Sequence, residues 1–225
     1  MTDTVYLNGE FLPLEEARIP VLDRGFIFGD GVYEVIRTYR GAPFELAAHL
    51  ARLERSAKEL SLIQPYSRAQ WTQWIQQGIS QAGYPEAKVY IQITRGVAPR
   101  DHAFPSGMSP TVVMTIRELH PLSLQIRQDG VTARTCDDLR WGRCDIKTSM
   151  LLAASLAKEE AKAEAAGEAW FVDDEGMVTE GASSNAWIVD KQGRFVTRPA
   201  GRDILRGTAR MRLIDVLNKE SLELV

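Results

Sequence analysis

The order of strand-like and helix-like stretches constrains the fold of this chain more than any other feature of its sequence. Residues 5–13, VYLNGEFLP, alternate apolar and polar side chains around Asn8 and Gly9, a dipeptide typical of a tight hairpin turn. An early antiparallel pair of strands is therefore expected. Four stretches follow. Residues 45–60 and 68–83 have a helical period, and residues 87–96 and 110–119 are strand-like.

A second set of elements begins after the pattern lapses at residues 120–130. Strand-like stretches then resume, and a helical stretch at 149–166 separates the first from the second of them. The strand-like stretches of this set are residues 131–136, 168–173, 185–190 and 194–198. We therefore expect two α+β domains, residues 1–120 and 121–225, with mainly antiparallel sheets.

Composition limits the classes of protein to consider. The 225 residues are 44% apolar and 25% charged, close to a globular average, so the chain can bury a core. No apolar run approaches the ~20 residues of a membrane span, and the start lacks the plan of a signal peptide, so a cytoplasmic protein is expected. The net charge is −3, and acidic and basic residues are interspersed, so the sequence shows no basic cluster of the kind that binds nucleic acid or an anionic membrane. The expected partners are small molecules or copies of the chain itself.

Neither a metal site nor a hydrolytic triad is expected. Cys136 and Cys144 have no metal-ligand spacing and no secretory context, which favours buried, reduced thiols. His49 and His120 are interpreted as structural. No His, Cys and Asp residues cluster at ligand spacing, and no Ser/His/Asp set is evident.

Lys147 departs from the pattern of the lysines around it. Lys158 and Lys162 stand among glutamates in the helical stretch, whereas Lys147 precedes that stretch, just before Thr148 and Ser149, either of which could cap the helix. A surface lysine is the ordinary alternative, but a cation there opposes the positive end of the helix dipole. A lysine whose pKa is lowered by desolvation suits a Schiff base with an aldehyde cofactor. Lys147 is therefore a candidate catalytic residue.

Four segments together resemble a known family. They are DRGFIFGDGVYEVIRTYRG, HLARLERSAKEL, RWGRCDIKTSMLLAASLAKEEA and VTEGASSNAWIV, in the order and at the separation seen in class IV aminotransferases, the fold-type IV enzymes of pyridoxal phosphate. Within that family the chain is most similar to the enzymes that use D-amino acids. The resemblance covers nearly the whole chain, and it implies a two-domain, homodimeric transaminase.

The resemblance implies roles for two residues in the chemistry. Lys147 corresponds to the lysine that forms the internal aldimine and moves the substrate α-proton. Glu180, in VTEGASSN, corresponds to the acid that keeps the pyridine nitrogen protonated, so that pyridoxal phosphate acts as an electron sink. An exposed turn glutamate is the ordinary alternative for Glu180, because the small polar residues after it suit a tight turn.

The cofactor phosphate requires cations and backbone donors. By resemblance HLARL supplies Arg52, for which the alternative is a helix-surface arginine paired with Glu45 or Glu59. DILRGTAR resembles a turn that binds phosphate at a helix start. The family usually has Gly, an aliphatic residue, Thr and Arg there, whereas this chain has Thr before Ala, so the backbone donors are kept and the hydroxyl has moved by one place. The remaining residues expected to bind the cofactor are Ser183, Ser184, Thr208 and Ala209.

Substrate recognition is expected at the loop TRGVAPRDHAFP, residues 94–105, which resembles the signature of the D-specific enzymes. The resemblance implies that Arg100, His102 and Tyr33 bind the substrate α-carboxylate, partly across a dimer interface. An arginine fork can grip a carboxylate at both oxygens. The ordinary alternatives are a loop histidine and a half-buried strand tyrosine. Arg140 and Trp141, beside the Lys147 motif, are expected to shape the pocket.

Three functional hypotheses follow from the resemblance. The first is a transaminase that exchanges amino groups between D-amino acids and 2-oxo acids, and RGVAPRDHAFP favours it. The second is a lyase of the same fold, as in aminodeoxychorismate lyases, with the same Lys147 and Glu180. The third is a truncated, non-catalytic relative, because family members continue past the point that matches Val225. An apparently shortened C-terminal domain is expected to leave a sheet edge uncovered and to weaken phosphate binding.

Overall fold

The computed structural model describes residues 3–225, in two compact units. Unit 1 is the chain up to Pro121 together with Ile146–Met150. Unit 2 is Leu122–Asp145 together with Leu151–Val225. The short segment that carries Lys147 therefore belongs to unit 1, although the chain has already entered unit 2 before reaching it.

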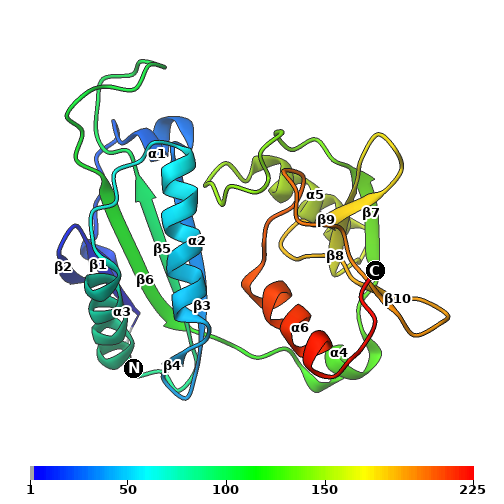
Figure 1. The fold of residues 1–225 in the computed structure, drawn as a ribbon. Coiled ribbons are helices and arrows are strands. Elements are labelled where there is room, and N and C mark those ends of the chain that lie inside the picture. The colour runs from blue at the N-terminus through cyan, green and yellow to red at the C-terminus, as the bar shows by residue number, and fades with distance from the viewer. Residues whose placement is uncertain (1–2) are drawn as a thin grey trace. The chain divides into compact units, whose positions relative to one another are not determined.

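Unit 1 is an antiparallel sheet of six strands in the order β2-β1-β6-β5-β3-β4, with two long helices packed on it (Figure 1). Helix α2 packs on β3, and α3 packs on β1 and β6. The elements of unit 1 are β1 (Thr4–Leu7), β2 (Glu10–Pro13), the 3-10 helix η1 (Leu14–Glu16), α1 (Arg24–Phe28), β3 (Gly31–Tyr39), β4 (Ala42–Pro43), α2 (Leu46–Glu59), α3 (Arg68–Ala82), β5 (Ala87–Thr94) and β6 (Thr111–Glu118).

The predicted hairpin and both predicted long helices are present. Leu7 pairs with Glu10 across the turn, and Asn8 and Gly9 have φ values of 50° and 115°, as a two-residue turn of this kind requires. Helix α3 begins with a capping box in which Ser67 and Gln70 bind each other's backbone N–H. Sequence-local signals therefore determine these elements.

The core of unit 1 lies between one face of the sheet and the two helices. Alternate strand residues enter it, such as Val32 and Ile36 of β3, and Trp71 and Ile75 of α3 belong to the same buried cluster. The residues between these strand positions point to the opposite face of the sheet, and Tyr33 is one of them. The strand thus carries core residues on one side and a predicted site residue on the other.

The segment that carries Lys147 completes the edge of β3. Strand β4 pairs with β3 only at its far end, and residues 147–149 pair at its start. The N–H of Tyr33 donates to the carbonyl of Lys147 at 3.0 Å, and the N–H of Ser149 donates to that of Gly31 at 3.0 Å. These bonds hold the backbone of Lys147 at the start of β3.

The expected helix start at Thr148 or Ser149 is wrong. The helix begins at Leu152, and its N-cap residue Leu151 has no side chain that can accept from the first amides. The hydroxyl of Ser149 donates instead to the carbonyl of Gly29 at 2.9 Å. Pairing with β3 therefore extends the backbone of residues 147–149 and delays the helix.

Unit 2 contains a three-stranded sheet in the order β7-β8-β9, with α5 packed on β7 and β8. Strands β7 and β8 are parallel because α5 connects them, whereas β8 and β9 are antiparallel. The short helix α4 lies where the sequence pattern lapses and was not predicted. The elements are α4 (Leu124–Asp129), β7 (Ala133–Asp137), α5 (Leu152–Ala163), β8 (Glu168–Val172), β9 (Val178–Gly181), β10 (Ile188–Val189), β11 (Phe195–Val196) and α6 (Thr208–Lys219).

The thiols of unit 2 are more accessible than expected. Cys136 and Cys144 are both free but only half-buried, so the prediction of buried thiols is wrong. Burial still raises the pKa of Cys144 to about 11, although the nearby Arg140 opposes that rise. Among residues 3–225, no helix is both long and apolar enough to cross a membrane.

Candidate active site

Lys147 lies against an aromatic side chain of unit 1. Its Nζ is 4.0 Å from the centroid of the Tyr33 ring, a distance at which a ring face attracts an ammonium group. The Tyr33 ring in turn lies 5.7 Å from that of Tyr90. The backbone N–H of Lys147 donates to Oγ of Ser56 in α2 at 3.2 Å. The structure thus brings together two predicted site residues, Lys147 and Tyr33.

Arg52 binds a carboxylate that the sequence analysis did not identify. Its Nε and Nη2 donate to the two oxygens of Glu34 at 2.7 and 2.8 Å, and Nδ1 of His49 lies 2.7 Å from Oε2. Glu34 is fully buried, and burial by itself would raise its pKa. The hydrogen bonds from Arg52 and His49 outweigh that effect, so the pKa is lowered and Glu34 is ionised.

A sequence signal for Glu34 was available. In VYEVIRTY, alternation places this residue on the same face of the strand as Val32 and Ile36, which belong to the core. A charged residue at such a position needs a buried partner. The partners, His49 and Arg52, lie in helix α2, so only the tertiary fold identifies them.

Arg100 and His102 lie on the exposed loop between β5 and β6. Cζ of Arg100 lies 5.5 Å from the ring centroid of Phe28, and the His102 ring lies 5.5 Å from the same ring. Phe28 is the last residue of α1. The structure therefore groups these two predicted substrate-binding residues around one aromatic side chain.

Glu180 is a buried strand residue of unit 2, not an exposed turn residue. It lies in β9 and is 4% exposed. Nη1 of Arg140 donates to its Oε1, and Oε2 accepts from Nδ2 of Asn185 at 2.8 Å and from the N–H of Leu205 at 3.0 Å. Burial raises the pKa of Glu180, although Arg140 and Leu205 act in the opposite direction. The carboxylate is therefore fixed in position by three donors.

Arg140 is shared by two carboxylates. Its Nε and Nη2 bind Asp138 at 2.8 and 2.7 Å, while Nη1 binds Glu180. Burial would raise the pKa of Asp138, but the hydrogen bonds from Arg140 and Thr179 lower it. Asp138 and Asn185 were not predicted as parts of this cluster. Trp141, which was expected beside the pocket, is 39% exposed.

Ser183 and Ser184 are exposed and bind a different carboxylate. Their hydroxyl groups donate to Oε2 of Glu168 at 3.3 and 2.9 Å. Nζ of Lys158 lies 2.8 Å from the other oxygen of Glu168. Burial would raise the pKa of Glu168, but the hydrogen bonds from Lys158 and its neighbours lower it. The structure therefore does not bring Ser183 and Ser184 into the carboxylate cluster of Glu180.

Thr208 and Ala209 form the first turn of α6. The N-cap residue, Gly207, has no side chain to bind the first amides of the helix. A Cβ at this glycine would come within 2.2 Å of Oδ1 of Asn185, so a larger residue here would displace that side chain. The neighbouring Arg210 is buried, and its Nε has no hydrogen-bond partner. Burial, with repulsion from Arg206, lowers the pKa of Arg210.

Each unit, considered separately, has groups that suit one part of a phosphorylated aldehyde cofactor. The start of α6 offers backbone N–H groups and the positive end of a helix dipole, which suit a phosphate. The partnerless Nε of Arg210 is a buried donor that an anion can satisfy. In unit 1, Lys147 supplies an amine and Tyr33 an aromatic surface. Taken unit by unit, the chemistry of these groups suits a phosphate in unit 2 and an aldehyde in unit 1.

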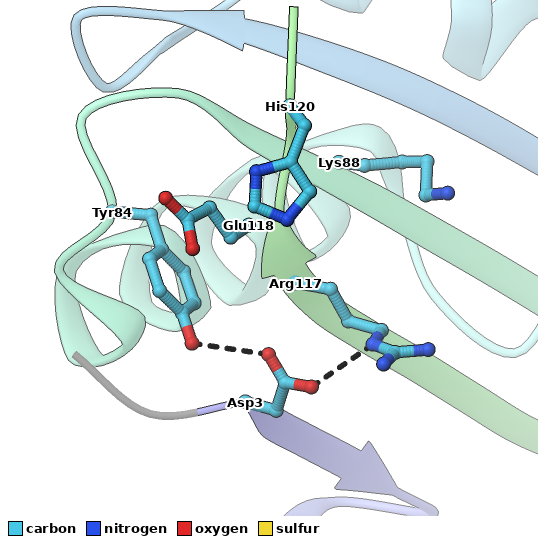
Figure 2. Close-up of a pocket in the computed structure, with 6 residues that line it drawn as sticks. All are labelled: Asp3, Tyr84, Lys88, Arg117, Glu118 and His120. Atoms are coloured by element: carbon cyan, nitrogen blue, oxygen red, sulfur yellow. Dashed lines mark hydrogen bonds and ion pairs between the residues drawn. The ribbon is translucent and has the colours of Figure 1, made fainter.

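The cavity shown in Figure 2 is separate from all of these residues. It has a volume of about 380 Å³ and is lined by Asp3, Tyr84, Lys88, Arg117, Glu118 and His120, none of which is a predicted site residue. Asp3 accepts hydrogen bonds from Tyr84 and Arg117 (Figure 2). Charges of both signs line the cavity and several of these side chains are exposed, as in an ordinary polar surface hollow. We assign no chemistry to it.

The chain is similar to characterised aminotransferases along most of its length. The family model for class IV amino-transferases matches residues 31–225. The D-alanine aminotransferase of Staphylococcus haemolyticus is 40% identical over 207 residues, which cover 92% of this chain and 72% of that protein. That of Bacillus licheniformis is 38% identical over 218 residues, which cover 97% and 76%.

Solved structures of aminotransferases are also similar to this chain along nearly its whole length. A branched-chain amino acid aminotransferase from T.th., solved with pyridoxamine 5'-phosphate, has a TM-score of 0.91 and 25% identity, over 100% of this chain and 76% of that chain. A branched-chain aminotransferase of Thermoproteus uzoniensis has a TM-score of 0.85 and 26% identity, over 99% and 76%.

The fold and these matches define the class of the protein: the chain belongs to the class IV aminotransferases. It is therefore an aminotransferase that depends on pyridoxal phosphate. The resemblance inferred from the four sequence segments is confirmed, and so is the expected fold class.

Proposed function

We propose that this aminotransferase exchanges amino groups between D-amino acids and 2-oxo acids, with its cofactor attached to Lys147. The high identity to proteins named D-alanine aminotransferases supports the choice of substrate. The structural observation that carries the proposal is the position of Lys147, whose amine lies on the ring of Tyr33 while its backbone is fixed at the start of β3.

Lys147 has two tasks in this proposal. It holds the cofactor through Nζ, and it then uses the same nitrogen to move the proton of the substrate α-carbon. Pyridoxal phosphate, when bound, supplies an electron sink for that carbon. The fixed backbone and the aromatic face limit the positions that Nζ can reach, which favours a directed proton transfer.

Glu180 is proposed to bind the pyridine nitrogen and to keep a proton there. Its burial supports this role, because a charge interaction is stronger where water is excluded. Arg140, Asn185 and Leu205 hold the carboxylate in one position, so little reorganisation is needed on binding.

The phosphate is proposed to be bound by Arg52 and by the backbone N–H groups of Thr208 and Ala209. The absence of a capping side chain at Gly207 supports the role of the α6 start. Arg52 is held in position by Glu34, and the planar fork of an arginine matches the geometry of a phosphate. Ser183 and Ser184 remain predicted cofactor ligands.

Arg100, His102 and Tyr33 are proposed to bind the substrate α-carboxylate. Arginine binds a carboxylate through two parallel hydrogen bonds, and histidine and tyrosine can each add one. The grouping of Arg100 and His102 around Phe28 supports a shared role for these two side chains.

We further propose a cytoplasmic homodimer. Two segments of unit 1 pair with each other through Asp23 and Val97, and large apolar side chains on them are exposed. Such an exposed apolar surface is typical of a protein interface. The exposed residues are Ile19, Val21, Leu22, Phe26, Val97 and Phe104.

The test is an assay of amino transfer by the purified protein with its cofactor. D-alanine and 2-oxoglutarate should yield pyruvate and glutamate, and L-alanine should be a poor donor. Release of pyruvate from aminodeoxychorismate without amino transfer would instead support the lyase. A protein that binds the cofactor and turns over none of these compounds would contradict both.

A further inference from the structure

Arg24 is a buried arginine that joins α1 to the loop that carries Arg100 and His102. It is the first residue of α1 and is 2% exposed. Its Nη1 donates to the carbonyl oxygen of Asp101 at 2.5 Å, and its Nη2 donates to that of His102 at 3.3 Å. Its Nε donates to Oδ2 of Asp30 at 2.8 Å. Nη1 also donates to the carbonyl oxygen of Ala103 at 3.4 Å, so one guanidinium holds three consecutive carbonyls of the loop.

Asp30 fixes Arg24 from the protein interior, because the same carboxylate also binds Arg95. Nε and Nη2 of Arg95 donate to Asp30 at 2.8 and 3.1 Å. Arg95 also donates to the carbonyls of Leu60 and Ser61 at 2.7 and 3.1 Å. A buried charge is tolerated when it is paired and hydrogen-bonded, as both arginines are. The loop is therefore attached to a buried polar cluster.

Phe28 links this cluster to the predicted substrate-binding side chains. Cζ of Arg24 lies 4.7 Å from the Phe28 ring centroid, and Cζ of Arg100 lies 5.5 Å from it. The His102 ring lies 5.5 Å from the same ring. Arg24 thus orders the backbone of residues 101–102, and Phe28 orders the side chains on either side of Asp101.

We propose that Arg24 is a positioning residue for substrate recognition. It holds the backbone of Asp101 and His102, so that the side chains of Arg100 and His102 are presented to the α-carboxylate of the substrate. This inference rests on the proposed function, because it assigns Arg24 to the site that distinguishes carboxylate-bearing substrates. Arg24 itself does not touch the substrate.

The first test is Arg24→Lys, which keeps the charge but removes the planar fork that reaches Asp30 and the loop carbonyls together. The KM for D-alanine should rise about tenfold while kcat changes little, because binding and not chemistry is affected. The visible absorption of the cofactor on Lys147 should be unchanged. The matched control is Arg18→Lys, since Arg18 is exposed and donates only to the nearby carbonyls of Glu15 and Ala17.

A double-mutant cycle separates positioning from general stability. In an Arg100→Ala background, Arg24→Lys should raise the KM much less than in the wild type, because the side chain that it positions is already gone. Equal fold-changes in the two backgrounds would overturn the inference. So would a fall in kcat with no change in KM.

Phe28→Leu provides a second variant if Arg24→Lys does not fold. Phe28 is only half-buried, and leucine keeps most of its apolar contact while removing the aromatic face. Its effect should also be a raised KM that is lost in the Arg100→Ala background. A wild-type enzyme that is active on D-alanine, together with Arg24 and Phe28 variants of unchanged KM, overturns this inference alone. A wild type without transfer activity overturns the proposed function.

Discussion

Arg140 donates to Glu180 in unit 2, where Glu180 is buried and the Arg140 side chain is 14% exposed. The same guanidinium binds Asp138, so one cation serves two acids. Burial raises the pKa of Glu180, whereas the hydrogen bonds from Arg140 and Thr179 lower the pKa of Asp138 despite its own burial. The cluster therefore depends on Arg140 for its charge balance.

Removal of Arg140 should destabilise the protein strongly. Arg140→Met leaves two carboxyl groups without their cation, and such a change costs about 3–5 kcal/mol in the free energy of unfolding. Urea unfolding at pH 7 measures it. The cost should shrink as the pH is lowered, because Glu180 and then Asp138 become protonated. The matched control is Arg134→Met, whose pairs with Glu160 and Glu164 are exposed and contribute only about 0–1 kcal/mol.

Glu180→Gln should separate catalysis from folding. The amide oxygen of glutamine can still accept from Leu205 and Asn185, while its NH2 group then faces Nη1 of Arg140, so the fold should be kept at reduced stability and the cofactor should still bind. Most of the turnover should be lost, because a neutral amide cannot keep the pyridine nitrogen protonated. Steady-state kinetics with D-alanine measure the turnover, and the visible absorption of the cofactor shows whether it is still bound. Near-normal turnover would remove Glu180 from the mechanism.

Much of the fold could be predicted because its signals are local. The hairpin at Asn8 and Gly9 and the helices α2 and α3 follow from turn chemistry, capping and spacing. The start of α5 could not be predicted in this way. Residues before Leu152 pair with β3, and that tertiary pairing overrides the capping preference of Ser149.

For the site residues, too, local sequence signals could be predicted and tertiary contacts could not. Lys147 and Glu180 were predicted as site residues from motifs, but the partners that fix them in the structure come from distant segments. Arg140 reaches Glu180 from the loop after β7, and Ser56 of α2 accepts from the backbone N–H of Lys147. No periodicity specifies such contacts, because they depend on how the elements pack. Arg24 was missed for this reason.

Lys147 should carry the cofactor covalently after borohydride reduction. The reduced protein should lose its visible absorption band, and peptide mapping should find the added mass on Lys147. Lys158 and Lys162 are the controls, since Lys158 binds Glu168 and Lys162 lies near Glu159 on the polar side of α5. A label on either of them would disprove the assignment.

Glu34 should make the stability of the protein depend on acid pH. Its pKa is lowered from 4.5, because the hydrogen bonds from Arg52 and His49 outweigh its burial. A carboxyl group whose pKa is lowered in the folded state stabilises the fold at pH values above its ordinary pKa. This stabilisation is lost as the pH falls through the folded-state pKa. Glu34→Gln should therefore cost about 3–5 kcal/mol at pH 7.

The cost of Glu34→Gln should decrease as the pH falls below 4.5, because the unfolded wild-type chain binds a proton at Glu34 there, and it should disappear only when the pH passes the lowered pKa of the folded protein. Urea unfolding of both proteins across this range measures the difference. Glu54→Gln is the control, because the pair of Glu54 with Arg68 is exposed and contributes about 0–1 kcal/mol. An equal cost at pH 7 and pH 3.5 would show that Glu34 acts through packing and not through charge.

Arg100→Ala should weaken the use of D-amino acids without changing the attachment of the cofactor. A charge-assisted fork to a carboxylate contributes roughly 1.5–3 kcal/mol, so kcat/KM for D-alanine should fall about 10- to 150-fold. The visible absorption should stay as in the wild type, because Arg100 lies on the β5–β6 loop and Lys147 is held separately by β3 and α2.

Arg100→Lys refines this prediction. A lysine keeps the charge but cannot bind both carboxylate oxygens in parallel, so its kcat/KM should lie between those of the wild type and the alanine variant. Amines that lack a carboxylate should be used equally by all three proteins, since they offer no partner to the fork. If Arg100→Ala leaves the kinetics for D-alanine unchanged, Arg100 is an ordinary solvated loop residue. The proposed D-specificity would then lose its structural basis, and a wild-type preference for L-alanine would have the same consequence.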